Sequence, residues 1–370
     1  MTDAAIFSAP TRIVAGLGSL EWLERELHAL GAQRVVIVCD RGVADAGLLE
    51  RVQGAMGAVD GALGGLVDPD PGVDDAERAA QRAAALGADA VLALGGGSAL
   101  GVGKAVALRL RNPDRIDAYA GRDRAPAPPA ACVAIPTTAG SGSEVSNAFV
   151  LDDPEREHAL IVRGRGYEPR VAILDGTLLA TLPARSMLEA GLDALSHALE
   201  ALWARGASSF TDALALRAAG HIYESLPAAL RQREPADLQL LLEASAMANL
   251  ACGSAELGLV HALSSAVAVR LPHGYLNGVL LPHVAAFNRP ELSAEARAAA
   301  DRLAQLYDAI GFAPRFDDGE IGADEVEHMV AAARHHPFHS NNIRPASEAD
   351  LRGILAAAGA VAPAYMEGVI

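Results

Sequence analysis

The sequence predicts an α/β domain built on a parallel sheet, followed by an all-α helical domain. In the first half, short β-branched apolar runs alternate with helical patterns, an order typical of a parallel sheet with helices on its faces. After Pro183, long alanine- and leucine-rich amphipathic segments follow one another with no clear strand among them. A chain of 370 residues is too long for one ordinary core, so we expect two domains, residues 1–182 and 183–370.

The individual elements follow from these patterns in chain order. Runs such as RVVIVCD are short, apolar and rich in β-branched residues, and strands are expected in residues 34–40, 88–98, 131–142 and 171–175. Helical patterns between them cover residues 74–87 and 100–110. The helices of the second half are expected in residues 185–204, 210–231, 237–269, 292–311 and 323–335. We expect the boundary between the domains near residues 179–186.

Charge and composition exclude several classes of protein. The formal net charge of −16 argues against broad binding to nucleic acids or anionic membranes, so neither is expected as a partner. No apolar run is long and charge-free enough to span a bilayer, and the N-terminus, with an acid at Asp3, does not resemble a signal peptide. The three cysteines are few and widely spaced, which favours a reducing compartment. We therefore expect a cytoplasmic protein.

A glycine-rich stretch follows the second expected strand. Residues 92–104 read LALGGGSALGVGK and place three glycines and a serine between a buried strand and a helix. Glycines there let the backbone approach a phosphate, and the N-terminus of the helix supplies N–H groups and a positive dipole end. An ordinary turn is the alternative. The residues expected to cradle a phosphate are Gly95, Gly96, Gly97 and Ser98.

A second loop of small residues, IPTTAGSGSEVSN at residues 135–147, follows the next expected strand. Loops at the carboxyl ends of neighbouring parallel strands face the same crevice, which is where open α/β sheets bind nucleotides. Thr137, Thr138 and Ser141 are therefore expected to flank a nucleotide, with helix capping as the alternative.

Asp40 ends the first expected strand. An acid at this position can accept hydrogen bonds from ribose hydroxyls and repel a 2′-phosphate, which favours NAD(H) over NADP(H). A helix N-cap before the following segment explains the residue equally well.

A group of acids and histidines lies in the second half. Asp193 and His197 are spaced i, i+4 in the apolar stretch GLDALSHALEALWA, so both project from one helix face. Residues 258–284 add His261, His273 and His283 on an apolar background. One carboxylate and up to three imidazoles form a plausible site for a divalent metal such as Fe²⁺ or Zn²⁺. A direct hydrogen bond between Asp193 and His197 is the alternative.

Six motifs occur together along the chain. They are GGGS at 95–98, PTTAGSGSE at 136–144, GLDALSHALEAL at 191–202, GLVHALS at 258–264, PHG at 272–274 and LPHV at 281–284. Together they resemble the iron-containing (group III) alcohol dehydrogenase family over nearly the whole chain. The resemblance implies a Rossmann-like nucleotide-binding domain followed by a helical metal-binding domain, the architecture that dehydroquinate synthase-like proteins share. It also makes a homodimer the expected assembly.

The resemblance assigns roles to residues at the matching positions. It implies that the metal ligands are Asp193, His197, His261 and His273, and that His283 is structural. It implies that the pyrophosphate lies on the glycine-rich loop and that Thr137, Thr138 and Ser141 flank the cofactor.

The expected activity is the interconversion of an alcohol and an aldehyde or ketone by hydride transfer to or from NAD(P), with the metal as Lewis acid on the oxygen of a small-molecule substrate. No side chain other than the metal ligands is expected to be catalytic.

Two alternatives keep the same fold. Gly101, in place of the aspartate that many members of the family carry, and the tail at residues 335–355 resemble the maleylacetate reductase branch, which reduces an anionic oxo acid. This chain keeps Asp193, where that branch often has asparagine. Arg270, three residues before His273, is a candidate for binding a substrate carboxylate, although a solvated surface arginine is the simpler interpretation. A dehydroquinate synthase-like lyase is the less favoured alternative.

Overall fold

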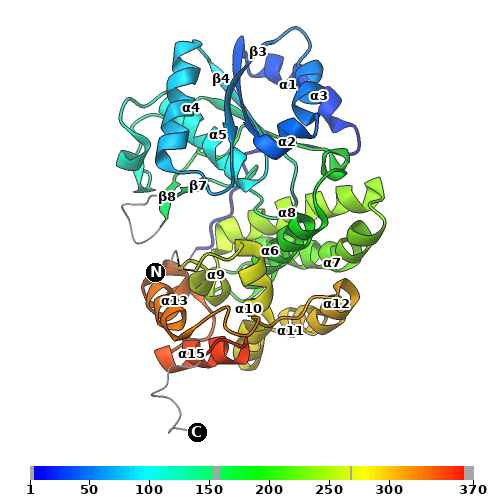
Figure 1. The fold of residues 1–370 in the computed structure, drawn as a ribbon, viewed down its shortest axis with the longest axis vertical. Coiled ribbons are helices and arrows are strands. Elements are labelled where there is room, and N and C mark those ends of the chain that lie inside the picture. Colours follow the sequence, from blue (N-terminus) through cyan, green and yellow to red (C-terminus); the bar gives the residue numbers. More distant parts are fainter. Residues whose placement is uncertain (1–3, 153–158, 267–268, 362–370) are drawn as a thin grey trace. The chain divides into compact units, whose positions relative to one another are not determined.

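The computed structural model describes residues 4–152, 159–266 and 269–361. By their internal contacts, the residues form two compact units, which are seen in Figure 1. The α/β unit comprises Ala9–Pro183 and Arg233–Ala246, and the helical unit comprises Met1–Ser8, Ala184–Gln232 and Met247–Ile370. The parallel sheet in the first unit and the helices of the second confirm the predicted fold class.

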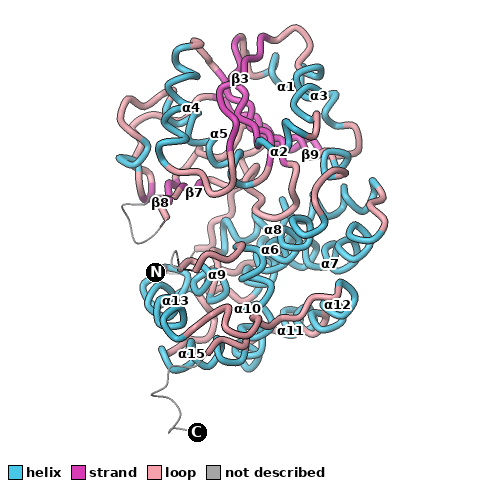
Figure 2. Tube along the Cα trace, viewed as in Figure 1, coloured by secondary structure: helices cyan, strands magenta, loops and turns pink. Residues whose placement is uncertain are grey.

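The α/β unit contains a six-stranded sheet, drawn in magenta in Figure 2. Its strands are β1 (Arg12–Ala15), β2 (Arg34–Asp40), β3 (Asp60–Val67), β4 (Ala90–Gly95), β6 (Ala131–Pro136) and β9 (Val171–Leu174). They lie in the order β1-β9-β6-β4-β2-β3, and every neighbouring pair is parallel. A smaller sheet of the order β5-β8-β7 is formed by β5 (Gly121–Arg122), β7 (Ala148–Leu151) and β8 (Leu160–Arg163).

Helices cover both faces of the large sheet, which explains why its central strands are apolar throughout. Val36 and Val38 of β2 belong to the core on the side of α4 (Val73–Ala85) and α5 (Gly97–Arg109). Val35 and Ile37 belong to the core on the side of α1 (Leu23–Ala29) and α3 (Leu48–Ala55). Figure 1 shows α4 and α5 on one side of the strands and α1 and α3 on the other. The short helix α2 (Arg41–Asp45) follows β2 directly.

All four predicted strands are present. The strand predicted in residues 88–98 ends at Gly95 and that in residues 131–142 ends at Pro136, because the loops that follow them leave the sheet. Five strands were not predicted, namely β1, β3, β5, β7 and β8. Of these, β3 has the sequence DGALGGLV, whose glycines remove the β-branched signal by which strands are recognised.

The helical unit is built on helices, most of which lie in the predicted alanine- and leucine-rich segments, whereas the helices at residues 273–288, 337–341 and 348–357 were not predicted. Its main helices, with α8 shared between the units, are α6 (Ala184–Leu202), α7 (Ser209–Arg231), α8 (Pro235–Ala255), α9 (Leu259–Ser264), α10 (His273–Asn288), α11 (Ala294–Ala300), α12 (Leu303–Ile310), α13 (Ala323–His335), α14 (Pro337–Asn341) and α15 (Glu348–Ala357). No helix of the described residues is long and apolar enough to cross a membrane.

The single helix predicted over residues 237–269 is wrong. Helix α8 ends at Ala255, and Glu256 has a φ of 60°, a left-handed conformation that breaks the helical hydrogen-bond ladder. A new helix, α9, begins after Gly258 and ends at Ser264. The end of the predicted range includes residues 267–268, which lie outside the described residues.

Helices α6 and α10 approach each other closely because glycines lie at their contact. A Cβ atom on Gly274 would lie 2.2 Å from the backbone oxygen of Glu189, and one on Gly278 would lie 2.6 Å from the side chain of Leu192. Only a residue without a side chain fits at the first position, because backbone cannot yield as a flexible side chain can. This close approach brings Asp193 of α6 to the first turns of α10.

Candidate functional site

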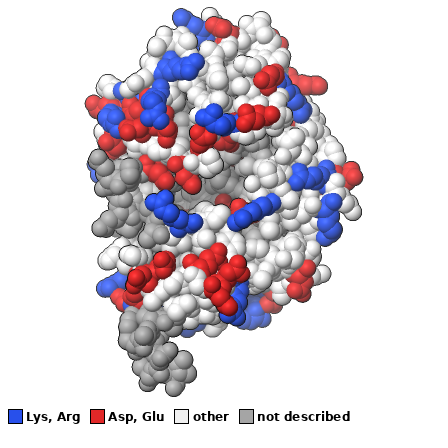
Figure 3. All heavy atoms as spheres, in the orientation of Figure 1, with Lys and Arg blue, Asp and Glu red and all other residues white. Residues whose placement is uncertain are grey.

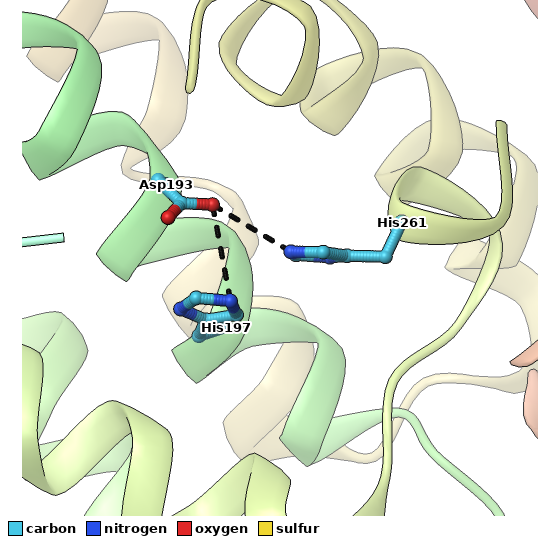
Figure 4. A group of neighbouring side chains, drawn as sticks. All are labelled: Asp193, His197 and His261. Carbon is cyan, nitrogen blue, oxygen red and sulfur yellow. Dashed lines mark ion pairs between the residues drawn. The ribbon is translucent and has the colours of Figure 1, made fainter. Parts of the chain in front are cut away.

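A buried cluster of one acid and two histidines lies in the helical unit. Asp193 and His197 are one turn apart on α6, and His261 lies on α9, as Figure 4 shows. One potential ligand atom from each residue lies within 4.8 Å of the other two. Oδ1 of Asp193 is 3.8 Å from Nε2 of His197 and 3.6 Å from Nε2 of His261. These distances are too long for hydrogen bonds, so the alternative of a direct Asp193–His197 hydrogen bond is not what the structure shows.

His273, the first residue of α10, faces the same carboxylate. Its Nε2 lies 3.7 Å from Oδ1 of Asp193, and its side chain is 52% exposed, whereas the other three residues are buried. The structure thus brings together all four predicted ligands. His283 lies elsewhere, with its Nε2 2.8 Å from the backbone oxygen of Pro314, as expected for a structural residue.

The charges of the cluster are coupled. Burial by itself would raise the pKa of Asp193, but the imidazoles of His197, His261 and His273 outweigh burial and lower it well below its usual range. Burial also lowers the pKa of His197 to about 4. Burial acts in the same direction on His261, but the carboxylates of Asp193 and Glu200 raise its pKa to about 9. The site therefore holds a buried negative charge whose partners are imidazoles.

Two further side chains complete the cluster, and the sequence analysis missed both. Nδ2 of Asn277 lies 2.8 Å from Oδ1 of Asp193, 3.1 Å from Nε2 of His261 and 3.0 Å from Nε2 of His273. Oε2 of Glu200 lies 2.7 Å from Nδ1 of His261. A signal for Glu200 was present, because residues 193, 197 and 200 share one face of a helix. The signal for Asn277 was weaker, an asparagine four residues after His273 in an apolar helix.

The donor set suits a divalent transition metal. One carboxylate and several imidazole nitrogens with free lone pairs are the groups that bind Fe²⁺ and Zn²⁺ in proteins. Nδ1 of His197 is buried and has no hydrogen-bond partner among the described residues. A cation at the cluster would compensate the buried charge of Asp193, whose burial without a partner would be costly.

The glycine-rich loop lies at the end of β4 in the α/β unit. Gly95 has a φ of +142°, and a Cβ atom on it would lie 2.2 Å from Oδ2 of Asp40. Gly96 is the N-cap residue of α5, so the free N–H groups of this helix start at the loop. A Cβ on Gly97 would lie 3.1 Å from Oγ of Ser141. Ser98 is half-buried in the first turn of α5.

The second predicted loop lies beside the first. Gly95 of β4 is paired with Pro136 of β6, and the N–H of Thr137 donates to the backbone oxygen of Gly95 at 3.0 Å. A Cβ on Gly96 would lie 3.3 Å from the side chain of Thr138. No helix begins between residues 137 and 147, so helix capping does not explain these residues.

Lys104 holds this second loop in place through hydrogen bonds to its backbone. It is buried in α5 and its Nζ donates to the backbone oxygens of Ser143 at 2.8 Å, Ser146 at 3.2 Å and Ala148 at 2.5 Å. Burial lowers the pKa of Lys104 to about 8 and raises the pKa of the neighbouring Glu144 to about 7. The lysine therefore joins the helix that starts at the glycine-rich loop to the loop after β6.

Asp40 makes a contact that neither of its predicted roles included. Asp40 is the N-cap residue of α2, as the alternative interpretation expected, but its side chain makes no capping hydrogen bond there. Oδ2 of Asp40 instead accepts a hydrogen bond of 2.5 Å from the N–H of Gly96. Burial raises the pKa of this carboxyl, although the bond from Gly96 acts in the opposite direction. Asp40 thus anchors the glycine-rich loop.

Arg270, the candidate for binding a substrate carboxylate, makes no hydrogen bond or ion pair with the cluster of Asp193, His197, His261 and His273 among the described residues. Arg270 is exposed, in line with the solvated interpretation. On the face drawn in Figure 3, acidic and basic residues are interspersed.

Comparison with known proteins places these features in one family. Residues 10–176 match the family described as iron-containing alcohol dehydrogenase, and residues 187–359 match its C-terminal domain. The chain is 36% identical over 287 residues to the NAD-dependent methanol dehydrogenase of Bacillus methanolicus, covering 76% of this chain and 75% of that protein. The chain belongs to the iron-containing alcohol dehydrogenase family, and it is an oxidoreductase of the NAD-dependent, metal-binding kind that this family comprises.

Two solved structures show the range of substrates among similar proteins. The sulfoacetaldehyde reductase of Bifidobacterium kashiwanohense in complex with NAD⁺ has a TM-score of 0.88 and 26% identity, covering 96% of this chain and 98% of that one. The maleylacetate reductase of Agrobacterium tumefaciens has a TM-score of 0.83 and 27% identity, covering 97% and 99%.

Proposed function

We propose that this protein interconverts a short alcohol and its aldehyde or ketone, with NAD(H) as the redox partner and a divalent metal held by Asp193, His197, His261 and His273. The observation that carries the proposal is the convergence of the three imidazoles on the Oδ1 atom of Asp193. In this function the metal supplies Lewis acidity toward the substrate oxygen, and NAD(H) supplies the acceptor or donor of hydride.

The residues of the chain would bind and orient these groups. The N–H groups at the start of α5 and the side-chain-free surface of Gly96 and Gly97 suit a pyrophosphate. Thr138 and Ser141 lie against these glycines and would flank the cofactor. In the helical unit, Asn277 donates a hydrogen bond to Asp193 and would hold that carboxylate in place while the metal is bound.

A preference for NAD(H) over NADP(H) rests on Asp40, at the carboxyl end of β2. Its negative charge would repel a 2′-phosphate. Because Asp40 also bonds to Gly96, the informative variant is Asp40→Asn, whose amide oxygen can keep that bond while the charge is lost. We expect the ratio of the NADPH to the NADH dissociation constant to fall by about tenfold or more on this substitution.

The substrate class rests on the similar proteins, and a neutral short alcohol is favoured by the match to the methanol dehydrogenase. An anionic aldehyde or oxo acid is the second candidate, since the similar structures include a sulfoacetaldehyde reductase and a maleylacetate reductase. The exposed Arg270, three residues before His273, would then meet the substrate anion.

The proposal also covers the identity of the metal, the oligomeric state and the cellular location. Either Fe²⁺ or Zn²⁺ suits the donor set. A homodimer would cover β1, an exposed edge strand of the sheet, together with the partly exposed Ile13, Leu17 and Trp22. A cytoplasmic location agrees with Cys39, Cys132 and Cys252, which are all buried and free.

One experiment separates the candidate substrates. Metal-loaded protein is mixed with NADH or NADPH and with short aldehydes, sulfoacetaldehyde or maleylacetate, and the nicotinamide absorbance is followed. The proposal expects the highest kcat/KM with a neutral aldehyde and NADH, unchanged by Arg270→Ala. A higher kcat/KM with an anionic substrate, lost in Arg270→Ala, would establish the second candidate. Binding of NADH without net turnover of any of them would favour a dehydroquinate synthase-like lyase.

A further inference from the structure

Glu200 is a fully buried acid that none of the proposed steps uses. It lies on α6, seven residues after Asp193 and therefore two turns along the same helix face, and it is 0% exposed. Its Oε1 atom accepts a hydrogen bond of 2.8 Å from the N–H of Val260. Its Oε2 atom accepts one of 3.3 Å from the N–H of His261 and lies 2.7 Å from Nδ1 of the same residue. Glu200 thus holds both the start of α9 and the ring of its histidine.

The space around Glu200 is fitted to this arrangement. A Cβ atom on Gly258, the N-cap residue of α9, would lie 2.9 Å from Oε1 of Glu200 and 2.9 Å from Oδ1 of Asn342. Asn342 is itself fixed by a reciprocal amide pair with Asn288 at 2.8 and 2.9 Å. The carboxylate therefore has little freedom to move away from the ring of His261.

The contact with Nδ1 determines which nitrogen of His261 carries a proton. A carboxylate 2.7 Å away accepts a hydrogen bond, so Nδ1 is the protonated nitrogen of the neutral ring. The lone pair is then on Nε2, which faces Oδ1 of Asp193 at 3.6 Å. The ring plane is also fixed, since it stacks on His197 with ring centroids 4.7 Å apart and an interplanar angle of 18°.

The negative charge of Glu200 also bears on the binding of a cation at the cluster. A buried carboxylate is retained only where a positive partner compensates it. The ring of His261 can supply that positive charge only when it carries a second proton, and in the neutral tautomer a bound cation would supply it. The carboxylates of Asp193 and Glu200 would together supply two negative charges to balance a divalent cation.

We propose that Glu200 is the positioning residue of the metal centre, and that it acts through His261 by fixing the tautomer and orientation of the ring. The inference rests on the proposed function to the extent that a metal binds at Asp193, His197 and His261. Partners of this kind, which hold a metal-binding histidine through its other nitrogen, typically tighten metal binding by about 10- to 100-fold.

The test measures metal affinity rather than turnover. The protein is stripped of metal, and the dissociation constant for Zn²⁺ is measured in competition with a chromogenic chelator, for the wild type and for Glu200→Gln. We expect Glu200→Gln to weaken binding by about 10- to 100-fold, because the amide nitrogen of glutamine would face N–H donors at one of the two positions where a carboxylate oxygen now accepts hydrogen bonds. The matched control is Glu77→Gln, another buried glutamate that accepts a backbone N–H, that of Ile116 at 2.7 Å, but in the α/β unit. It should leave the Zn²⁺ affinity within about twofold of wild type.

Two more variants show whether the effect passes through the ring. In a His261→Ala background, Glu200→Gln should change the Zn²⁺ dissociation constant by less than about twofold, since the ring that it orients is absent. Gly258→Ala keeps the charge of Glu200 but displaces its carboxylate, and it should also weaken binding. The absorption of bound Co²⁺ should change in Glu200→Gln and Gly258→Ala but not in Glu77→Gln.

Different outcomes would overturn different statements. A wild-type protein that binds Zn²⁺ tightly and a folded Glu200→Gln variant with the same affinity would refute the role of Glu200 alone. If Glu200→Gln lowers the Zn²⁺ affinity equally in the presence and the absence of His261, Glu200 acts only through its negative charge and the positioning role is refuted. If Glu200→Gln does not fold, unchanged affinity in Gly258→Ala would refute that role instead. A wild-type protein that binds no divalent metal would refute the proposed metal site and this inference with it.

Discussion

At the scale of single residues, the carboxylate of Asp193 is the group around which the centre is arranged. Its Oδ1 atom faces three imidazoles and accepts a hydrogen bond from Asn277. Replacing this acid by asparagine keeps the shape of the side chain and removes the charge. We expect Asp193→Asn to lose bound metal and to lower kcat/KM by about 10²- to 10³-fold.

The measurement for Asp193→Asn is metal content together with NADH binding. NADH affinity should be retained, because the glycine-rich loop belongs to the other unit. Asp212→Asn, a partly buried acid of α7 outside the cluster, is the control and should keep its metal. Full metal content in Asp193→Asn would show that the cluster is not the metal site.

Asn277 supports a second prediction at this scale. Because its amide reaches Asp193, His261 and His273, Asn277→Ala should weaken metal binding by about 10-fold or more. The control is Asn112→Ala in the α/β unit, a buried asparagine whose amide donates to the backbone oxygens of Leu108 and Ala127. It should cost about 1–3 kcal/mol in the free energy of unfolding but leave metal affinity unchanged. Equal metal affinities in the two variants would contradict the assignment of Asn277 to the centre.

The raised pKa of His261 predicts how metal binding depends on pH. In the metal-free protein this pKa is raised to about 9 from an ordinary 6.5. The protonated ring therefore contributes stability that is complete below pH 6.5 and is lost as the pH rises through about 9. At neutral pH the metal must displace this proton, whereas His197, with its pKa lowered to about 4, is already neutral.

Calorimetric titration with Zn²⁺ in buffers of different ionisation enthalpy measures the protons released. The account expects His261 to contribute about one released proton at neutral pH and close to none above about pH 9, so the apparent affinity should rise with pH in between. Metal affinity that does not change over this range would contradict the assignment.

Sequence patterns pointed to the four residues of the proposed metal site, but not to the side chains that support them. Asp193 and His197 stood out because a carboxylate and an imidazole at i, i+4 in an apolar helix need an explanation. The roles of Glu200 and Asn277 depend on a helix that starts at residue 259 and another that starts at residue 273. Their packing against α6 is a tertiary contact, which no local pattern contains.

At the scale of secondary structure elements, sequence patterns predicted the bounds of an element well where one type of residue dominates its sequence. The strand RVVIVCD was predicted at its observed bounds, Arg34–Asp40, and α7 began within one residue of its prediction. The break after α8 was missed, because a left-handed Glu256 is a feature of backbone conformation and not of hydrophobic periodicity. The break bears on the proposed metal site, since α9, which begins after it, carries His261 beside Asp193.

The glycine-rich loop supports a prediction about an element. A side chain on Gly97 would meet Ser141, whose Oγ lies 3.1 Å from the position of a Cβ, and would cover the start of α5. We expect Gly97→Val to weaken NADH binding by about 10-fold or more, measured by fluorescence titration. The control is Gly101→Ala in the same helix, where the Cβ would be 3.7 Å from its nearest neighbours. It should bind NADH normally and be more stable by about 0.4–1 kcal/mol.

An NADH affinity of Gly97→Val equal to that of Gly101→Ala would show that the cofactor does not use the start of α5. The comparison is matched because both substitutions add a side chain to a glycine of the same helix.

At the scale of the whole molecule, the proposed cofactor site and the proposed metal site belong to different units. The glycine-rich loop, Asp40 and Lys104 belong to the α/β unit, and the acid–histidine cluster belongs to the helical unit. The first half of α8 is grouped with the α/β unit, where Gln239 bonds to the backbone of Leu174 and Gly176. Sequence patterns predicted a change from sheet to helices near residue 183. They did not predict that the first half of α8 packs with the α/β unit, because contacts between segments so far apart in the chain leave no local signal.

The most direct test of the account is whether turnover depends on the metal. The protein is stripped with a chelator and reloaded with Fe²⁺ or Zn²⁺, and the oxidation of NADH by a short aldehyde is followed by absorbance. The account predicts that the stripped protein is inactive, that metal restores its activity, and that metal does not restore the activity of Asp193→Asn. Undiminished turnover by the stripped protein would contradict the central claim and leave Asp193 and the histidines as a structural cluster.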